Sequence, residues 1–305
     1  MHWILGAGRR LRELGVLGMN RRNAGYILDH NPRARFPVVD DKLRMRDLCM
    51  RMGVPTPKIY ARIPFHSMLP RLAELLEEHQ EFVIKPSRGS AGRGVLVIDG
   101  RAGRAFIRHN GDTLSLDQLR QHLSGILSGM YSLAGRPDCA LVQQRVHLHP
   151  TFAPVAYKGI PDIRVIVYRG RPAMAMLRLP TKASNGRANL HQGGIGVGVA
   201  IDTGQTNHAV QRNRVVYLHP DTGASLLGLR VPCWKLVVDM ACRIADAVGL
   251  GYLGVDIVVD EFHGPMLLEA NARPGLAIQI ANGQGLLARL REIDRQIEEQ
   301  QSSAA

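Results

Sequence analysis

The sequence predicts an α+β fold in which antiparallel strand hairpins alternate with helices. Apolar runs on either side of a short turn predict one hairpin over 254–271. Two alternating runs joined by Arg169-Gly170-Arg171-Pro172 predict another over 163–179. Apolar residues recur at helical spacing on one face of 234–248. Because hairpins are interleaved with helices, without a regular strand–helix–strand repeat, the pattern favours α+β layers.

The other elements follow along the chain. Asp40 and Asp41 open a helix that extends to about Met52, because the helix dipole favours carboxylates at the N-terminal end. Leucines at helical spacing predict further helices, and short apolar runs bounded by Gly and Pro predict strands. We expect a helix at 69–79, strands at 82–86 and 95–98 joined by a loop at 87–94, a helix at 116–133, a strand at 140–142, a polar Gly-rich loop at 182–198 and a helix at 284–299.

The two ends of the chain lie outside this predicted core. Residues 1–40 are rich in arginine and show only a short amphipathic pattern, so we expect a solvated basic arm or a truncated N-terminal region. A basic patch for an acidic partner is the alternative. We expect a polar tail at 296–305.

The chain is strongly basic, with 39 Lys and Arg against 26 Asp and Glu among 305 residues, a formal net charge of +13. Such an excess favours anionic partners, including nucleotides, acidic peptides, nucleic acid and anionic membrane surfaces. We do not expect nucleic-acid binding, because the basic stretches lack interleaved aromatic residues and a groove-reading helix.

Several features indicate a cytoplasmic protein. The four cysteines show no C-x-x-C spacing, which fits a reducing compartment. No apolar run approaches the roughly 18 residues of a membrane span. Arginines interrupt the first 17 residues, so they lack the apolar core of a signal peptide. We also expect a homo-oligomer.

The most informative motif is a set of oxygen-bearing residues at one end of the 254–271 hairpin. Asp256 lies near the start of the first strand, and Glu269 and Asn271 lie near the end of the second. In an antiparallel pair these ends are adjacent, and residues two apart share a face. Hard oxygen ligands of this kind suit Mg²⁺ held together with substrate phosphates. Because carboxylates without a metal would repel each other, we expect Asp256→Ala to abolish activity with little loss of fold.

A second motif is a strand that delivers Lys85 into the Gly/Ser-rich loop 87–94. Glycines let backbone N–H groups approach an anion, and the lysine adds a point charge. The loop lacks the G-x-x-x-x-G-K-[ST] pattern and leads into a strand, so it is not a P-loop. An ordinary hairpin turn with a solvated lysine is the alternative.

Two further motifs carry charge or polarity. Asp162 and Arg164 share one strand and Arg178 lies on the returning strand, where arginine would grip a carboxylate or phosphate. A surface ion pair between Asp162 and Arg164 is the alternative. A polar loop around Asn189 could close over a substrate, and we interpret His191 as a hydrogen-bonding loop residue rather than a catalytic base.

Taken together and in this order, these motifs resemble the ATP-grasp superfamily, and within it the RimK-type α-L-glutamate ligases. The resemblance spans roughly residues 40 to 290. The matching stretches are Asp41-Lys42-Leu43, Phe82-Val-Ile-Lys85-Pro-Ser-Arg-Gly-Ser-Ala-Gly-Arg-Gly-Val95, Leu141-Val-Gln143-Gln144-Arg-Val146, Lys158-Gly159-Ile-Pro-Asp162-Ile-Arg164, Arg187-Ala-Asn189-Leu-His-Gln-Gly-Gly194, Gly254-Val-Asp256-Ile and Glu269-Ala-Asn271-Ala-Arg-Pro-Gly275.

The resemblance implies a role for each matched residue. It implies that lysines and a glycine loop hold the phosphates of ATP, that a hinge strand borders adenine and that three oxygen ligands hold Mg²⁺ or Mn²⁺. The implied nucleotide-binding residues are Lys42, Lys85, Ser87, Gly89, Ser90, Gly92, Gly94, Gln143, Gln144, Arg145, Val146 and Asp162. The implied metal ligands are Asp256, Glu269 and Asn271. Arg164 would contact the transferred phosphoryl group, and Arg178, Arg187 and Asn189 would face the carboxylate substrate or its acyl phosphate.

The resemblance also implies the organisation and the reaction. We expect an ATP-grasp domain at 41–295, with a lid subdomain at about 55–145 and a C-terminal subdomain at about 146–295 that together clasp ATP, and without the full N-terminal α/β domain of the family. The implied reaction joins a carboxylate, that of glutamate or another amino acid, to an amine of a peptide, protein or amino acid through an acyl phosphate. The same chemistry on a small-molecule or cell-envelope precursor, and a non-catalytic nucleotide-binding regulator, are the alternatives.

Overall fold

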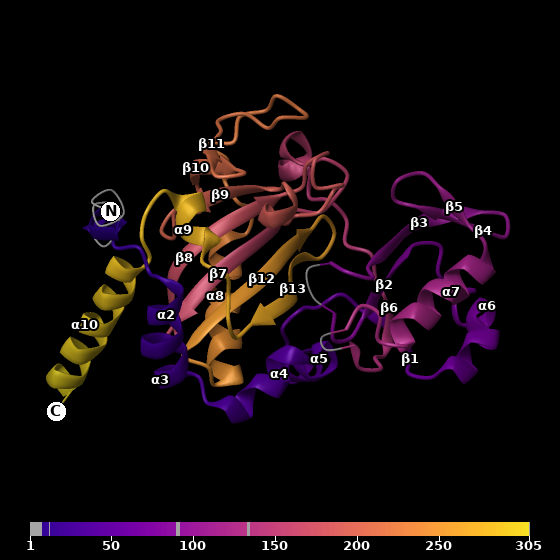
Figure 1. Cartoon of the computed structure of the whole chain (residues 1–305), viewed down its shortest axis with the longest axis horizontal. Helices are drawn as coiled ribbons and strands as arrows, with labels where there is room; N and C mark the ends of the chain where they lie inside the picture. The colour runs from indigo at the N-terminus through magenta and orange to yellow at the C-terminus, as the bar shows by residue number, and fades with distance from the viewer. Residues whose placement is uncertain (1–7, 12, 90–91, 133–134, 305) are drawn as a thin grey trace. The chain divides into compact units, whose positions relative to one another are not determined.

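The computed structural model describes residues 8–11, 13–89, 92–132 and 135–304 (Figure 1). The chain forms two compact units. The small unit contains Asp40–Asp47 and Thr56–His147, and the large unit contains Met1–Val39, Leu48–Pro55 and Leu148–Ala305. Each unit is built on an antiparallel sheet with helices, so the predicted α+β class is confirmed.

The small unit is an antiparallel sheet covered by short helices. Its strand order is β1-β6-β2-β3-β4-β5. Apolar side chains from β2 and β6 and from helix α7 share one core, including Phe82, Ile84 and Leu123. The elements are α5 (Lys42–Arg51, its first residues), β1 (Ile59–Ile63), a 3₁₀ helix (His66–Arg71), α6 (Leu72–Leu75), β2 (Phe82–Pro86), β3 (Leu96–Ala102), β4 (Ala105–Arg108), β5 (Thr113–Leu114), α7 (Leu116–Leu127) and β6 (Ala140–Gln143).

Two helices of the small unit are shorter than predicted. The expected helix at 69–79 is a 3₁₀ helix containing Pro70, followed by the four-residue α6. The expected helix at 116–133 begins with a capping box at Ser115 but ends as α7 at Leu127. It ends there because Gly129 has a φ of +84°, outside the helical region, and a Cβ at this position would lie 2.4 Å from the Arg136 carbonyl oxygen.

The large unit is a sheet with the order β11-β10-β9-β8-β7-β12-β13, and all its strand pairs are antiparallel. Both predicted hairpins are confirmed, as β7–β8 and β12–β13. The elements are β7 (Asp162–Tyr168), β8 (Arg171–Leu179), β9 (Ile195–Val199), β10 (Thr206–Gln211), β11 (Arg214–Val215), α8 (Trp234–Val248), β12 (Tyr252–Asp260), β13 (Gly264–Asn271), α9 (Ala277–Asn282) and α10 (Leu287–Ala304).

The expected loop at 182–198 is wrong in its last part, where β9 forms. Gly196 and Gly198 hid this strand from the sequence pattern, because glycine is uncommon inside strands. Both positions require glycine because α9 packs closely against the backbone of β9. A Cβ on Gly198 would lie 2.8 Å from the Ala281 carbonyl oxygen, and one on Gly196 would lie 3.0 Å from the Ala281 Cβ.

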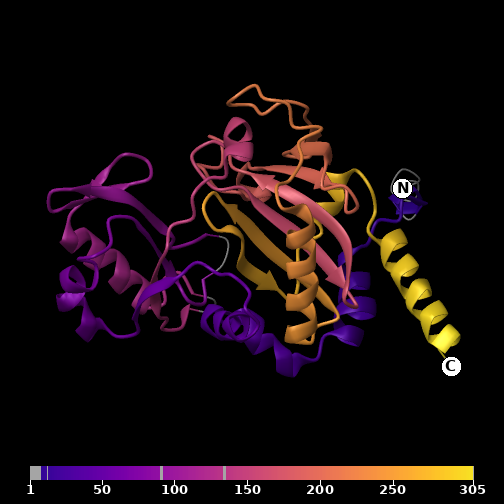
Figure 2. The same cartoon turned by 180° about the vertical axis from the view of Figure 1, so that it is seen from behind.

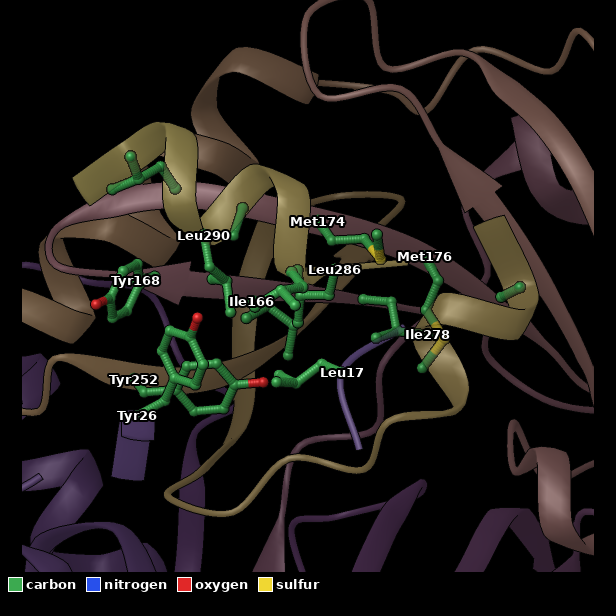
Figure 3. Close-up of a cluster of buried hydrophobic side chains, with 14 of the residues drawn as sticks. Leu17, Tyr26, Ile166, Tyr168, Met174, Met176, Tyr252, Ile278, Leu286 and Leu290 are labelled. Atoms are coloured by element: carbon green, nitrogen blue, oxygen red, sulfur yellow. The ribbon is translucent and has the colours of Figure 1, made fainter. Parts of the chain in front are cut away.

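The two faces of the large sheet are covered differently. Helix α8 packs against β7, β8 and β12 on one face, as the reverse view shows (Figure 2). On the other face, Ile166, Tyr168 and Tyr252 join α9, α10 and the N-terminal segment in a second core (Figure 3). Residues alternate between faces along a strand, so Asp162 and Arg164 lie on the same face as Ile166, nearer one end of β7. The second core therefore covers the part of this face around Ile166 and Tyr168, and polar residues occupy the end of the large sheet near Asp162 and Arg164.

The N-terminal region differs from the expected solvated arm. Residues 19–40 form α2 (Met19–Arg22), a π-helix (Asn23–Ile27), α3 (Leu28–His30), a 3₁₀ helix (Arg33–Arg35) and α4 (Phe36–Asp40). Leu17, Tyr26 and Ile27 are buried in the second core, and the Tyr26 and Tyr168 rings meet edge to face with centroids 5.4 Å apart. The C-terminal end also differs, because α10 continues through the expected tail to Ala304.

Candidate functional site

The polar end of the large sheet carries a row of predicted site residues on four adjacent strands. Arg164 of β7 is the register partner of Asp256 of β12, which is in turn the partner of Glu269 of β13. Asp162 of β7 is the partner of Arg178 of β8. Residues directly opposite in an antiparallel pair share a face, so the register alone places these side chains together.

Asp256 lies at the centre of this row and is fully buried. Its Oδ1 accepts a bond from Arg164 Nε at 2.6 Å, and its Oδ2 accepts bonds from Arg164 Nη2 at 2.5 Å and Arg178 Nη2 at 2.8 Å. Arg178 Nε also donates to Asp162 Oδ1. A fully buried carboxylate is therefore compensated by two guanidinium groups, one of them in a bidentate fork.

This charge arrangement shifts the pKa values of the two buried aspartates in opposite directions. Burial alone would raise the pKa of Asp256, but the charges of Arg164 and Arg178 hold it well below its usual range. Burial raises the pKa of Asp162 to about 7, because it is compensated mainly by Arg178 and is repelled by Asp256. Burial would lower the pKa of Arg178, but its two aspartate neighbours raise it further above the ordinary arginine range. Asp256 is therefore ionised at neutral pH.

Glu269 and Asn271 complete the row on the edge strand. Asn271 Nδ2 lies 3.3 Å from Asp256 Oδ2 and 3.5 Å from Glu269 Oε1, so the three predicted metal ligands converge. Among the described residues, no group of three His, Cys, Asp or Glu side chains could hold a metal ion by itself. Two carboxylates and an amide still fit Mg²⁺, which usually takes one or two protein carboxylates and completes its shell with waters and phosphate oxygens.

The contacts of Asp256 argue against the expectation that Asp256→Ala would leave the fold nearly intact. It assumed carboxylates that repel each other without a metal. The structure instead pairs Asp256 with Arg164 and Arg178, so its removal would leave two arginines partly uncompensated inside the unit. Glu269 is half-buried and is the better residue for separating metal binding from folding.

In the small unit, the loop after Lys85 is shaped by bonds that the sequence did not reveal. Lys42 Nζ donates to the Gly89 carbonyl oxygen at 2.7 Å. Buried Asp138, which we did not predict, accepts bonds from Arg88 N at 2.9 Å and Ser132 Oγ at 2.6 Å. The predicted loop residues Gly92 and Gly94 have φ of +70° and +72°, which lie in the left-handed region. The predicted residue Ser90 lies outside the described residues.

The predicted adenine hinge lies at the end of β6. Gln144 is tied to Lys58 twice: its N–H donates to the Lys58 carbonyl oxygen at 2.7 Å, and its Oε1 accepts from Lys58 N at 3.1 Å. Arg145 forms ion pairs with Glu81 and Asp99, at 3.1 and 2.9 Å. Gln143 is buried and Val146 is half-buried.

The remaining predicted substrate residues have other partners in this structure. Arg187 is exposed and its Nη1 lies 3.4 Å from Gln192 Oε1. The Asn189 side chain caps the 3₁₀ helix Leu190–Gln192 by accepting from His191 N at 3.0 Å. The loop that holds them is tied down, because Thr181 Oγ1 and Gln211 Nε2 both donate to the Gly193 carbonyl oxygen.

The two antiparallel α+β units are those of the ATP-grasp fold, as the sequence motifs predicted. The sequence matches the family described as sugar-transfer associated ATP-grasp over residues 21–295, and the chain belongs to that family. No helix in the part of the chain that the structure describes is long and apolar enough to cross a membrane.

Two curated relatives carry the name probable alpha-L-glutamate ligase. The protein of Thioalkalivibrio sulfidiphilus is 28% identical over 285 residues, which cover 92% of this chain and 68% of the relative. That of Maridesulfovibrio salexigens is 30% identical over 236 residues, which cover 77% of this chain and 56% of the relative. The matched part of this chain thus corresponds to about two thirds of the length of the first relative and a little over half of the second.

Similar solved structures include ATP-grasp ligase PsnB with a phosphomimetic precursor variant, Mg and ADP, at 15% identity and a TM-score of 0.47. That similarity covers 88% of this chain and 60% of PsnB. D-alanine–D-alanine ligase from Bacillus anthracis is 14% identical with a TM-score of 0.46, covering 88% of this chain and 70% of the ligase. Scores at this level add nothing to the family assignment.

Proposed function

We propose that this protein is an ATP- and Mg²⁺-dependent ligase that joins a carboxylate to an amine through an acyl phosphate. The carboxylate is that of glutamate or another amino acid, and the acceptor is an amine of a peptide, protein or amino acid. The family assignment and the relatives named probable alpha-L-glutamate ligase support this proposal. The observation that carries it is the row of Arg164, Asp256 and Glu269 in register across three adjacent strands.

The residues present fit a magnesium site that is completed by nucleotide phosphates. Asp256, Glu269 and Asn271 would hold the ion, since carboxylate and amide oxygens are the donors that Mg²⁺ prefers. A bound Mg²⁺ would act as a Lewis acid and a template for the phosphates. Arg164 and Arg178 hold Asp256 ionised in the absence of the ion, so the ligand is preorganised before nucleotide arrives.

The reaction has two steps. A carboxylate oxygen of the substrate attacks the γ-phosphorus of ATP, the bond to the β–γ bridging oxygen breaks and ADP leaves. An amine nitrogen then attacks the acyl carbon, the carbon–oxygen bond to phosphate breaks, phosphate leaves and the nitrogen loses a proton. Little covalent chemistry falls to the protein, so alignment and charge compensation carry the catalysis.

The residues of each unit have distinct tasks in this proposal. Arg164 would neutralise the transferred phosphoryl group, and Arg178 would contact the acyl phosphate while Asp162 fixes its orientation. Arg187 and Asn189 would contact the carboxylate substrate. In the small unit, which contains the proposed lid at about 55–145, the nucleotide contacts would come from Lys42, Lys85, the 87–94 loop and residues 143–146.

The test combines phosphate release with product detection. Purified protein, ATP and Mg²⁺ are incubated with single amino acids and acidic peptides, and products are identified by mass spectrometry. We expect phosphate release that depends on a carboxylate and an amine, together with a new amide. Glu269→Gln should lower turnover by about 100-fold or more, the scale for losing one charge-stabilising group. Glu261→Gln, in the exposed turn of the same hairpin, is the matched control and should leave turnover within about twofold, since it contacts neither metal nor nucleotide in this proposal.

Two outcomes would contradict the proposal. Nucleotide binding without phosphate release for any amino acid, acidic peptide or sugar precursor would indicate the non-catalytic regulator. Equal activity of Glu269→Gln and Glu261→Gln would show that the β12–β13 edge is not the metal site.

A second candidate keeps the chemistry and changes the substrate to a small-molecule or cell-envelope precursor. The observation in its favour is the family's description as sugar-transfer associated. The same assay separates the two, because amino sugars and anionic sugar precursors would then give the amide product and amino-acid acceptors would not.

A further inference from the structure

The N-terminal segment reaches the main chain that follows the proposed metal ligands. We propose that Asn31 and Arg22 are positioning residues that fix the end of β13, and with it Glu269 and Asn271, for metal binding. This inference rests on the proposed function and adds a role for a segment that the site description does not use. Every residue involved belongs to the large unit.

Asn31 joins the beginning of β12 to the end of β13 and is 4% exposed. Its Oδ1 accepts from Tyr252 N at 2.8 Å, and its Nδ2 donates to the Tyr252 carbonyl oxygen at 2.7 Å. The same Nδ2 donates to the carbonyl oxygen of Ala272 at 3.2 Å. Ala272 directly follows Asn271, whose register partner Gly254 is the last of the β12–β13 ladder. The Asn31 amide therefore links the two strands immediately beyond the last backbone pair.

Arg22 makes the second contact, two residues further along. Its Nη1 donates to the Pro274 carbonyl oxygen at 2.8 Å, and the guanidinium is otherwise held by Asn23 Oδ1. The chain at Pro274 lies tightly on β12, since a Cβ added to Gly254 would lie 2.6 Å from the Pro274 Cβ. Arg22 is 8% exposed, and a buried guanidinium is costly unless its donors are satisfied. The bond from Arg22 to the Pro274 carbonyl oxygen therefore helps to satisfy a buried charged group.

The location of β13 makes such support necessary. It is the edge strand of the seven-stranded sheet, so β12 is its only strand neighbour among the described residues. A register shift also occurs in the β12–β13 ladder between Asp256 and Ile257, beside the ligand row. Metal-binding side chains near the end of an edge strand need support from outside the ladder to stay within the tolerance of a metal site.

A control variant at a residue that holds the same segment separates a purely structural role from positioning. Gln279 of α9 binds Leu17 in both directions, accepting from its N–H at 2.7 Å and donating to its carbonyl oxygen at 3.1 Å. It also accepts from Leu286 N at 2.9 Å. Gln279→Ala therefore loosens the N-terminal segment and a core contact without touching the carbonyls of Ala272 or Pro274.

The experiment measures Mn²⁺ binding by electron paramagnetic resonance in the 305-residue chain saturated with a nonhydrolysable ATP analogue, alongside the thermal unfolding midpoint. We expect Asn31→Ala and Arg22→Ala each to raise the Mn²⁺ dissociation constant by about tenfold or more, as for residues that orient metal ligands. Arg22→Lys should recover part of the loss, because an ammonium can still donate to the Pro274 carbonyl oxygen. Gln279→Ala should lower the unfolding midpoint and keep the Mn²⁺ constant within about twofold, since it touches no residue that orients the ligands.

Several outcomes would overturn the inference. If Asn31→Ala does not fold, Arg22→Ala and Arg22→Lys decide it alone. An unchanged Mn²⁺ constant in Arg22→Ala, or an equal loss in Gln279→Ala, would reduce the segment to a structural element. If the wild-type protein binds nucleotide but no Mn²⁺, or if Glu269→Gln binds Mn²⁺ as the wild type does, the proposed function itself has failed and this inference fails with it.

Discussion

Removing Asp256 should destabilise the large unit strongly, contrary to what the sequence suggested. The carboxylate is fully buried, and the side chains of Arg164 and Arg178 are 11% and 13% exposed. Asp256→Ala would leave Arg164 without its partner and Arg178 with Asp162 alone. Breaking a buried pair by removing one member costs about 3–5 kcal/mol. For a unit of about 200 residues this corresponds to a fall of roughly 6–20 °C in the unfolding midpoint.

The assay is thermal and urea unfolding of purified variants, followed by far-ultraviolet circular dichroism. Glu292→Ala removes the partner of Arg289 in a half-exposed ion pair of 2.9 Å on α10, and serves as the control in the same unit. Its midpoint should change little, because solvent screens such pairs. Glu269→Ala should also change stability little, since Glu269 is half-buried and pairs with no arginine at hydrogen-bonding distance among the described residues.

A double variant isolates the interaction. Both side-chain bonds of Arg164 go to Asp256, so Arg164→Met combined with Asp256→Ala removes the pair and leaves Asp162 with Arg178. The combined loss should be smaller than the sum of the single losses by about 0.5–3 kcal/mol. Strict additivity, or an Asp256→Ala midpoint equal to that of the wild type, would refute the pairing as a source of stability.

Three further predictions concern the small unit and the cysteines. Gly94→Ala should destabilise by about 1–2 kcal/mol in urea unfolding and raise the KM for ATP, because φ is +72° and the new Cβ would lie 2.6 Å from the Tyr131 ring. Burial lowers the pKa of His122 below 6.5. Below pH 6.5 the unfolded state therefore binds a proton at this histidine more readily than the folded state does, and the free energy of unfolding falls as pH drops. His122→Gln should flatten this decline between about pH 7 and pH 5 in urea titrations, and an unchanged slope would contradict it. Burial raises the pKa of Cys49 to about 11, so iodoacetamide at neutral pH should label exposed Cys233 well before Cys49, as peptide mass spectrometry can follow.

The sequence predicted two pairs in this row of polar residues because each pair depends on local information. Alternating apolar residues and a turn set each hairpin, and the hairpin register places Asp256 beside Glu269. The same argument placed Asp162 and Arg178 on facing strands. It could not predict that β7 pairs with β12, because these strands lie far apart in the sequence and no local pattern records such a pairing. The choice of Arg164 as the partner of Asp256 follows only from that long-range register.

The N-terminal region shows the opposite limit. Its helices are short and one is a π-helix. Its many arginines obscure the hydrophobic pattern of the three apolar residues that are buried. Burial of Leu17, Tyr26 and Ile27 depends on a surface that only the folded large unit offers, so hydrophobic periodicity within the segment was too weak to reveal it. The bonds that join Asn31 to Ala272 and Arg22 to Pro274 go to backbone carbonyls, which carry no sequence signature.

The charge balance of the row explains why nucleotide and metal should bind together. Asp162, Asp256 and Glu269 carry up to three negative charges against two positive charges from Arg164 and Arg178, and the higher pKa of Asp162 brings the row closer to neutrality. A divalent ion alone would add positive charge beside two buried guanidinium groups, which is unfavourable in a medium of low polarity. A triphosphate supplies the missing negative charge and gives the arginines a second anion to contact. We therefore expect Mn²⁺ to bind weakly without nucleotide and tightly with it, and tight binding of the ion alone would contradict this account of the site.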